Sequence, residues 1–394
     1  MAMLARIRGR TFATLLLASS LWMPHAWAQG EEAKPFETKA PNAFLMEAAT
    51  GTVLFSKQPD TLIAPASLAK LMTMEVVFDA VKSGRARLED VYTVSENAWR
   101  TGGAPSGTST MFAKLGSQLT LNDLIQGAIV QSANDACIII AEGMAGSEEK
   151  FAALMNERAR QIGLTQSVFK NATGLPEEGQ VVSLRELALL GQHIWQTYPE
   201  LYRIYAQPDF TWNKIFQRNR NPLLKLGIGA DGMGTGYTEA SGYAILGSAE
   251  QNGRRLFAAL SGMTSEAERA QEARKLLDLG MNGFDEERLF DEGAIVGRAS
   301  VFGGVSPEVT LKALSTVKVF VPVSAKDLLR VRLIYKGPLQ APIMSGEPIG
   351  ALQVWIGDDL AKSFELAAAE DVARGSLSSR AADAARELAF GWLR

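Results

Sequence analysis

Ser67 and Lys70 are the pair of residues whose types and spacing best support catalysis. A serine hydroxyl is a weak nucleophile and needs a positioned base. In Ser67-Leu68-Ala69-Lys70, the i to i+3 spacing places both side chains on one helix face, one turn apart. The residues that follow are mostly apolar, so we expect a buried helix running to about Lys82. Burial should lower the pKa of Lys70 toward a range where its amine accepts a proton.

The start of this helix offers a second catalytic element. Pro65 suits the first helical position, so Ser67 lies in the first turn, where backbone N–H groups lack partners and can stabilise an oxyanion. The sequence holds two histidines, His25 and His193, and the second lies in an apolar helical stretch where a packing role is expected. A serine nucleophile here must therefore use a base other than histidine, and we expect no metal and no cofactor.

Two further tripeptides could complete a site. Ser132-Ala133-Asn134 supplies a hydroxyl that can relay a proton and an amide that can hold a substrate backbone. In isolation, this tripeptide is better explained as a polar turn that connects two helices. Gly234-Thr235-Gly236 follows at a plausible distance. A second S-x-x-K match, Ser147-Glu148-Glu149-Lys150, is better explained by Ser147 capping a helix.

These motifs in this order resemble those of the low-molecular-mass penicillin-binding proteins, the serine D-alanyl-D-alanine carboxypeptidases of bacterial cell walls. The resemblance covers nearly the whole chain beyond the N-terminal segment. It is carried by Pro65-Ala66-Ser67-Leu68-Ala69-Lys70, residues 131–137, Asn171-Ala172-Thr173-Gly174-Leu175, residues 218–224, residues 231–238 and residues 268–277.

The resemblance implies a role for each matching residue. Ser67 forms the acyl-enzyme, Lys70 activates it, and Ser132 passes the proton to the departing D-alanine. The N–H groups of Ser67 and Tyr237 form the oxyanion hole. The residues implied to bind the peptide are Asn134, Gly234, Thr235, Gly236, Tyr237, Arg220 and Arg269. The implied partners are the D-Ala-D-Ala stem peptide of peptidoglycan and β-lactams, which act as covalent inhibitors.

Gly234 departs from the family pattern, which has lysine at this position. That lysine supplies positive charge near the substrate carboxylate and the second-motif serine, and Arg220, Lys225 or Arg269 could substitute for it. A second interpretation is therefore a peptidoglycan-binding or scaffolding protein of the same fold with impaired catalysis. A third, a β-lactamase, fits less well because its deacylating glutamate has no obvious place.

The pattern of elements predicts a sheet covered by helices. The resemblance implies that residues 38–284 form an α/β (α+β) domain of the DD-peptidase/β-lactamase type, with an antiparallel sheet. Strands are predicted at residues 43–48, 52–56, 243–248 and 255–260, the last two joined by an Asn252-Gly253 hairpin turn. Helices are predicted at residues 120–144, 147–162, 184–198 and 266–281.

Residues 285–375 are predicted to form an all-β domain, because Val317, Val319 and Val321 begin an alternating pattern that recurs later in the segment. Residues 376–394 are predicted to form an amphipathic helix. This tail resembles the helix that lays the family's enzymes on the outer face of the inner membrane, and the resemblance implies attachment mainly by apolar insertion.

The N-terminus has the pattern of a cleaved signal peptide over residues 1–28: three arginines, an apolar run over residues 11–23, and Ala26-Trp27-Ala28 as the cleavage site. We therefore expect a periplasmic protein bound peripherally to the inner membrane. Removal of residues 1–28 changes the net charge from −3 to −6, because three arginines and no acidic residue are lost. An acidic mature chain argues against nucleic acid as a partner. The single cysteine, Cys137, excludes an intramolecular disulfide.

Overall fold

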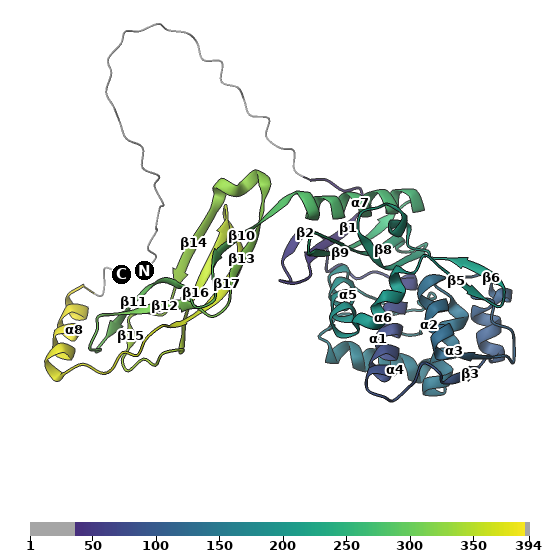
Figure 1. Cartoon of the computed structure of the whole chain (residues 1–394), viewed down its shortest axis with the longest axis horizontal. Coiled ribbons are helices and arrows are strands. Elements are labelled where there is room, and N and C mark those ends of the chain that lie inside the picture. Colours follow the sequence, from purple (N-terminus) through teal and green to yellow (C-terminus); the bar gives the residue numbers. More distant parts are fainter. Residues whose placement is uncertain (1–35, 391–394) are drawn as a thin grey trace, which may run out of the picture. The chain divides into compact units, whose positions relative to one another are not determined.

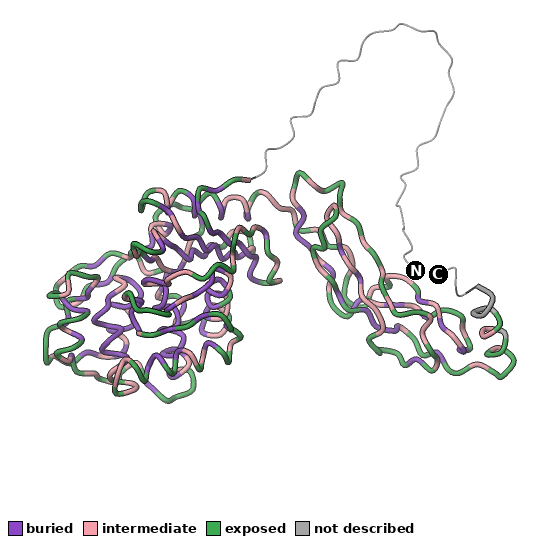
Figure 2. Tube along the Cα trace, turned by 180° about the vertical axis from the view of Figure 1, so that it is seen from behind, coloured by how far each residue is buried: buried purple, intermediate pink, exposed green. Residues whose placement is uncertain are grey.

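The computed structural model describes residues 36–390, so the predicted signal peptide lies outside the described residues. The chain divides into an N-terminal unit, residues 36–282, and a C-terminal unit that begins at Gly283 (Figure 1). Each unit has its own hydrophobic core, which appears as buried segments along its strands and helices (Figure 2).

A five-stranded antiparallel sheet forms the centre of the N-terminal unit, in the order β2-β1-β9-β8-β7. Its strands are β1 (Asn42–Glu47), β2 (Val53–Lys57), β7 (Ala230–Thr238), β8 (Gly242–Gln251) and β9 (Arg254–Met263). Gln251 pairs with Arg254 across the Asn252-Gly253 turn, which confirms the predicted hairpin. The predicted antiparallel sheet is therefore confirmed.

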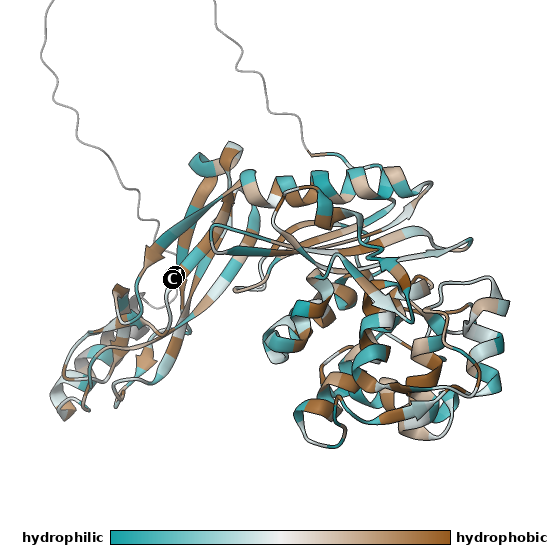
Figure 3. Ribbon diagram, turned by 45° about the vertical axis from the view of Figure 1, so that its right-hand side comes forward, coloured by the Kyte–Doolittle hydropathy of each residue, from teal (hydrophilic) through white to brown (hydrophobic). Residues whose placement is uncertain are grey.

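Helices cover both faces of this sheet (Figure 1). On one face, Gly191 of α5 (Leu184–Thr197) lies against Leu246 and Phe257. On the other, α7 (Glu266–Asn282) packs along β9 and β8, with Leu277 close to Gly247. The hydropathy colouring shows hydrophobic residues concentrated in the central strands and in the helices packed against them (Figure 3).

The other α-helices described in this unit include α1, which begins at Lys70, and α3, which begins at Asn134. In chain order, these helices are α1 (Lys70–Lys82), α2 (Leu121–Val130), α3 (Asn134–Ala145), α4 (Glu148–Gln161) and the short α6 (Pro199–Tyr202). This unit also contains two small antiparallel strand pairs, β3 (Val91–Thr93) with β4 (Gln118–Thr120), and β5 (Asp209–Trp212) with β6 (Ile215–Arg218).

The prediction of one helix over residues 120–144 was wrong, because the helix is interrupted between α2, which ends at Val130, and α3, which begins at Asn134. Ser132 adopts a left-handed backbone conformation with φ of 57°. The N–H of Ala133 donates to the carbonyl of Gly127, and the N–H of Asn134 donates to the carbonyl of Ser109, outside the helix. These two bonds satisfy backbone N–H groups at the point where the helix is interrupted.

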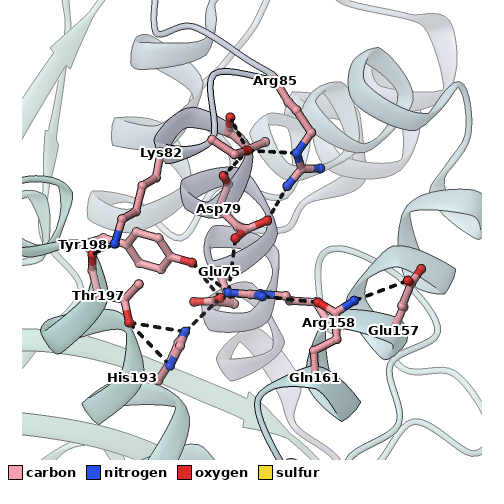
Figure 4. A network of polar contacts seen from close by, with 12 residues as sticks. Glu75, Asp79, Lys82, Arg85, Glu157, Arg158, Gln161, His193, Thr197 and Tyr198 are labelled. Atoms are coloured by element: carbon pink, nitrogen blue, oxygen red, sulfur yellow. Dashed lines mark hydrogen bonds and ion pairs between the residues drawn. The ribbon is translucent and has the colours of Figure 1, made fainter.

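A buried carboxylate fixes α1 against its neighbours (Figure 4). Glu75 Oε1 lies 2.8 Å from Arg158 Nε, 2.9 Å from Tyr198 Oη and 3.2 Å from His193 Nε2. Burial alone would raise the pKa of Glu75, but the hydrogen bonds from His193, Arg158 and Tyr198 outweigh it and lower the pKa. His193 therefore has a structural role in this network, as its apolar helical context predicted.

The C-terminal unit is an all-β domain followed by one helix, as predicted. A six-stranded sheet has the order β14-β16-β17-β12-β11-β15, and β10 pairs with β13. The strands are β10 (Phe284–Phe290), β11 (Ile295–Phe302), β12 (Glu308–Ala313), β13 (Val317–Pro322), β14 (Leu329–Ile334), β15 (Leu339–Gln340), β16 (Pro348–Ile356) and β17 (Asp359–Ala368). The core includes Val317, Val319 and Val321, the valines of the predicted alternating pattern.

The last described element is α8 (Leu377–Phe390). Its Asp383 accepts a hydrogen bond of 3.0 Å from the N–H of Gly303, whereas Ala381 and Ala385 are exposed. Across residues 36–390, the structure contains no helix with the length and apolar character needed to cross a membrane.

Candidate active site

Ser67 and Lys70 lie at the junction of two helical segments. Ser67 belongs to a 3-10 turn, η1 (Ala66–Ala69), and Lys70 is the first residue of α1. Lys70 Nζ lies 2.9 Å from Ser67 Oγ and 2.7 Å from the carbonyl oxygen of Thr173. The lysine is 5% exposed, and burial lowers its pKa from 10.5 to about 8. A neutral amine in this position can accept the hydroxyl proton of Ser67.

Two glycines allow the chain to approach this turn closely. A side chain at Gly174, whose φ is 79°, would place its Cβ 1.7 Å from the carbonyl oxygen of Ala66. A Cβ at Gly236 of β7 would lie 3.0 Å from Ala66 Cβ and 3.1 Å from the carbonyl oxygen of Pro65. Because neither glycine has a side chain, the Thr173 carbonyl and strand β7 both reach the nucleophile.

The second motif presents a hydroxyl and an amide to the same cleft. Ser132 lies at the break between α2 and α3 and lines the cleft. Asn134 is 4% exposed, its Nδ2 donates to Thr108 Oγ1 at 2.9 Å, and its Oδ1 has no hydrogen-bonding partner among the described residues. The buried Asp135 carboxylate fixes this region by accepting bonds from Thr110, Met111, Ala113 and Ala136.

The cleft has a volume of about 1460 Å³, enough for an extended peptide. Its lining includes the cationic side chains of Arg218, Arg220, Lys225 and Arg269. Arg269, on α7, is 6% exposed, its guanidinium lies 5.6 Å from the ring of Tyr243, and its Nε has no partner among the described residues. Burial lowers the pKa of Arg269 from its ordinary value. A buried guanidinium with a free N–H is suited to a carboxylate.

Gly234 opens a small separate cavity behind the nucleophile. The cavity has a volume of about 30 Å³, and its lining includes Ser67, Lys70, Ser132 and Gly234. A Cβ on Gly234 would have a single neighbour within 4 Å, Leu68 Cδ2 at 3.9 Å. The backbone therefore leaves space for a side chain at this position.

The structure brings the predicted site residues together. The residues that line the cleft are Ser67, Ser132, Asn134, Arg220, Thr235, Gly236, Tyr237 and Arg269. Lys70 and Gly234 line the small cavity behind them. Ser147 caps α4 by accepting from the N–H of Lys150, so the second S-x-x-K match is structural.

Sequence reasoning missed several residues that complete this arrangement. Thr173 contributes a backbone carbonyl, and Thr108 holds the amide of Asn134. Tyr205 and Asn221 line the small cavity. A signal existed for the first of these, because Asn171-Ala172-Thr173-Gly174 is a turn sequence, and Asn171 Oδ1 accepts from the N–H groups of Thr173 and Gly174.

Cys137, on α3, is buried near Lys70. Burial raises the pKa of its thiol to about 12. A thiol in this environment stays protonated and has no nucleophilic role.

The fold and the order of the two domains are shared with known proteins. Residues 28–264 match the Peptidase S11 family, D-alanyl-D-alanine carboxypeptidase, and residues 284–374 match the C-terminal domain of penicillin-binding protein 5. The chain therefore belongs to the low-molecular-mass penicillin-binding proteins, the serine-type D-alanyl-D-alanine carboxypeptidases.

Individual relatives resemble it over most of its length. D-alanyl-D-alanine carboxypeptidase DacC of Escherichia coli is 36% identical over 92% of each chain. The crystal structure of penicillin-binding protein 5 from Haemophilus influenzae has a TM-score of 0.75 and 34% identity, covering 87% of this chain and 100% of that one. Penicillin-binding protein D2 from Listeria monocytogenes, in its cefotaxime-bound form, has a TM-score of 0.58 and 26% identity, covering 64% of this chain and 100% of that one.

Proposed function

We propose that the protein removes the terminal D-alanine from peptidoglycan stem peptides through an acyl-enzyme on Ser67. The observation that carries this proposal is the 2.9 Å contact between Ser67 Oγ and the buried amine of Lys70 at the base of a peptide-sized cleft. β-Lactams should acylate the same serine, since a relative in this fold has been crystallised in a cefotaxime-bound form.

Acylation begins when neutral Lys70 takes the proton of Ser67 as Oγ bonds to the carbonyl carbon of the penultimate D-alanine. The N–H groups of Ser67 and Tyr237 stabilise the oxyanion. The C–N bond to the terminal D-alanine then breaks, and Ser132 relays a proton from the Lys70 ammonium to the leaving amine. In deacylation, water attacks the ester, releases the shortened peptide and returns the proton to Ser67.

Binding of the peptide uses both sides of the cleft. The unpartnered Oδ1 of Asn134 can accept an N–H of the peptide backbone, and strand β7 offers Thr235 and Tyr237 on the opposite side. Arg269 binds the terminal carboxylate of the peptide, because its buried guanidinium has an Nε–H without a partner among the described residues. Arg220 also lines the cleft and adds positive charge.

The test is incubation with labelled penicillin, followed by intact mass measurement. We expect one adduct, which Ser67→Ala abolishes. Ser147→Ala is the matched control, because it removes the serine of the other S-x-x-K match and should retain the adduct. An adduct that persists in Ser67→Ala would refute the assignment.

A second candidate function is binding or scaffolding without efficient turnover, and Gly234 is the observation that favours it. The family lysine is missing, and among residues 36–390 only Leu68 approaches the position of a Cβ on Gly234 within 4 Å, at 3.9 Å. The distinguishing measurement is D-alanine release from a D-Ala-D-Ala peptide. A protein that forms the penicillin adduct but never releases D-alanine would have this second function.

We further propose export to the periplasm after cleavage at residue 28 and peripheral attachment to the inner membrane through α8. Asp383 turns toward its own domain while Ala381 and Ala385 remain exposed, which leaves an apolar face for the membrane. A chain truncated after Gly375 should lose membrane association in fractionation. Ala385→Asp keeps the helix but places a charge on this face, so it should weaken association as well. Equal partitioning of all three proteins would contradict the attachment.

A further inference from the structure

The small cavity behind the nucleophile has a built polar lining. Besides Ser67, Ser132 and the buried Lys70, its polar lining includes Tyr205 and Asn221, each 2% exposed. Among the described residues, neither Tyr205 Oη nor Asn221 Nδ2 has a hydrogen-bonding partner. Two such atoms on one small cavity are unusual, because buried polar groups in folded proteins are almost always paired.

Both groups are held in place by their other contacts. Asn221 Oδ1 accepts a bond of 3.0 Å from the N–H of Leu223, which fixes the amide so that Nδ2 is the free donor. The ring of Tyr205 packs against Phe78 and Tyr202, with centroids 6.5 Å and 5.6 Å away. The unpaired atoms therefore belong to rigid side chains and not to mobile ones.

The chemistry of the lining decides the occupant. Asn221 Nδ2 only donates, and the Lys70 amine lies on the same cavity, so a metal cation or an alkylammonium ion is disfavoured. The hydroxyls of Tyr205 and Ser132 both donate and accept. Water satisfies such a mixed set, and a volume of about 30 Å³ holds one or two water molecules.

We propose that the space left open by Gly234 is a structural water site, in which Tyr205 and Asn221 hold water against Ser132. This water occupies the place of the family lysine and supplies a hydrogen bond to the second-motif serine. Tyr205 and Asn221 are thus positioning residues. The catalytic consequence rests on the proposed function, whereas the water site does not.

Crystallography of the wild type and of Tyr205→Phe tests the site directly. We expect density for water within hydrogen-bonding distance of Tyr205 Oη and Asn221 Nδ2, with at least one water lost in the variant. A dry cavity, or one filled by the Arg220 guanidinium, would overturn the proposal. This result is independent of turnover, so it stands even where no D-alanine release is found.

A double-mutant cycle with Gly234→Lys tests the role of the water. In the wild-type background, Tyr205→Phe should lower the acylation rate constant by about tenfold, the effect of one hydrogen bond. In the Gly234→Lys background, where the lysine displaces the water, the same change should have less than about a twofold effect. An equal loss in both backgrounds would mean that the hydroxyl has only a packing role.

Tyr202→Phe provides the matched control for this cycle. Tyr202 is also buried and is a close neighbour of Tyr205, but its hydroxyl already donates to Asp231 Oδ1 at 3.1 Å and does not line the cavity. Its loss should leave acylation within about twofold of the wild type. A loss equal to that of Tyr205→Phe would show that removal of any buried hydroxyl disturbs the site, which refutes the assignment.

Discussion

The lowered pKa of Lys70 predicts a steep dependence of acylation on pH. With a pKa of about 8, the amine is neutral in roughly a tenth of molecules at pH 7 and in about nine-tenths at pH 9. The second-order rate constant for acylation by a fluorescent penicillin should therefore rise about tenfold between these values. Lys70→Arg serves as the control, because a guanidinium stays protonated and should acylate slowly at every pH. A flat profile in the wild type would refute the role of Lys70 as base.

The lowered pKa of Lys70 should also make the free energy of unfolding depend on pH. A fall from 10.5 to about 8 means that burying the ammonium costs about 3 kcal/mol, at 1.36 kcal/mol per pKa unit. The unfolded chain binds more protons than the folded one between these pH values, so stability rises as pH increases through this window. Relative to Lys70→Met, the wild type should gain about 2 kcal/mol of unfolding free energy between pH 7 and pH 10, measured by urea denaturation. A difference that does not change with pH would show that the lysine is not desolvated.

Three other predictions concern single positions. Gly234→Lys should raise kcat/KM for D-alanine release by about ten- to a hundred-fold, since it restores one charge-assisted hydrogen bond; a fall would mean that another group already fills this space. Glu75→Gln should lower the unfolding free energy by about 3 kcal/mol at pH 7, and this difference should shrink as pH falls through the lowered pKa of Glu75, because that carboxylate stabilises the fold only while ionised. Gly174→Ala should cost more than about 3 kcal/mol because its Cβ would collide with the Ala66 carbonyl, whereas Gly146→Ala, with φ of 82° but open space, should cost about 1 kcal/mol; equal losses would attribute both to backbone strain.

The sequence was sufficient where chemistry and structure are local. Ser67 and Lys70 are three residues apart, so helical geometry alone places them together, and alternation of valines is enough to identify the β domain. The hairpin at Asn252-Gly253 could also be predicted, because this dipeptide favours one type of two-residue turn between antiparallel strands.

Features that depend on tertiary contacts were beyond the sequence. The turn at Asn171-Ala172-Thr173-Gly174 could be predicted, but its contact with Lys70 could not, because the Thr173 carbonyl that accepts from Lys70 is a backbone atom far away in the sequence. The helix break at Ser132 lacks glycine or proline, and it is compensated by a bond from Asn134 to the distant Ser109. The cavity at Gly234 required coordinates, because Tyr205 and Asn221 reach it from separate segments.

The burial of Cys137 makes the chain well suited to site-directed labelling. The single native thiol is fully enclosed and stays protonated at neutral pH, so maleimide reagents have no native target in the folded protein. A cysteine introduced on the surface would thus carry a fluorophore at one known position without removal of the native residue. Placed on the exposed side of α8, such a probe would show through its emission spectrum whether this helix contacts lipid. The wild-type core would remain intact throughout.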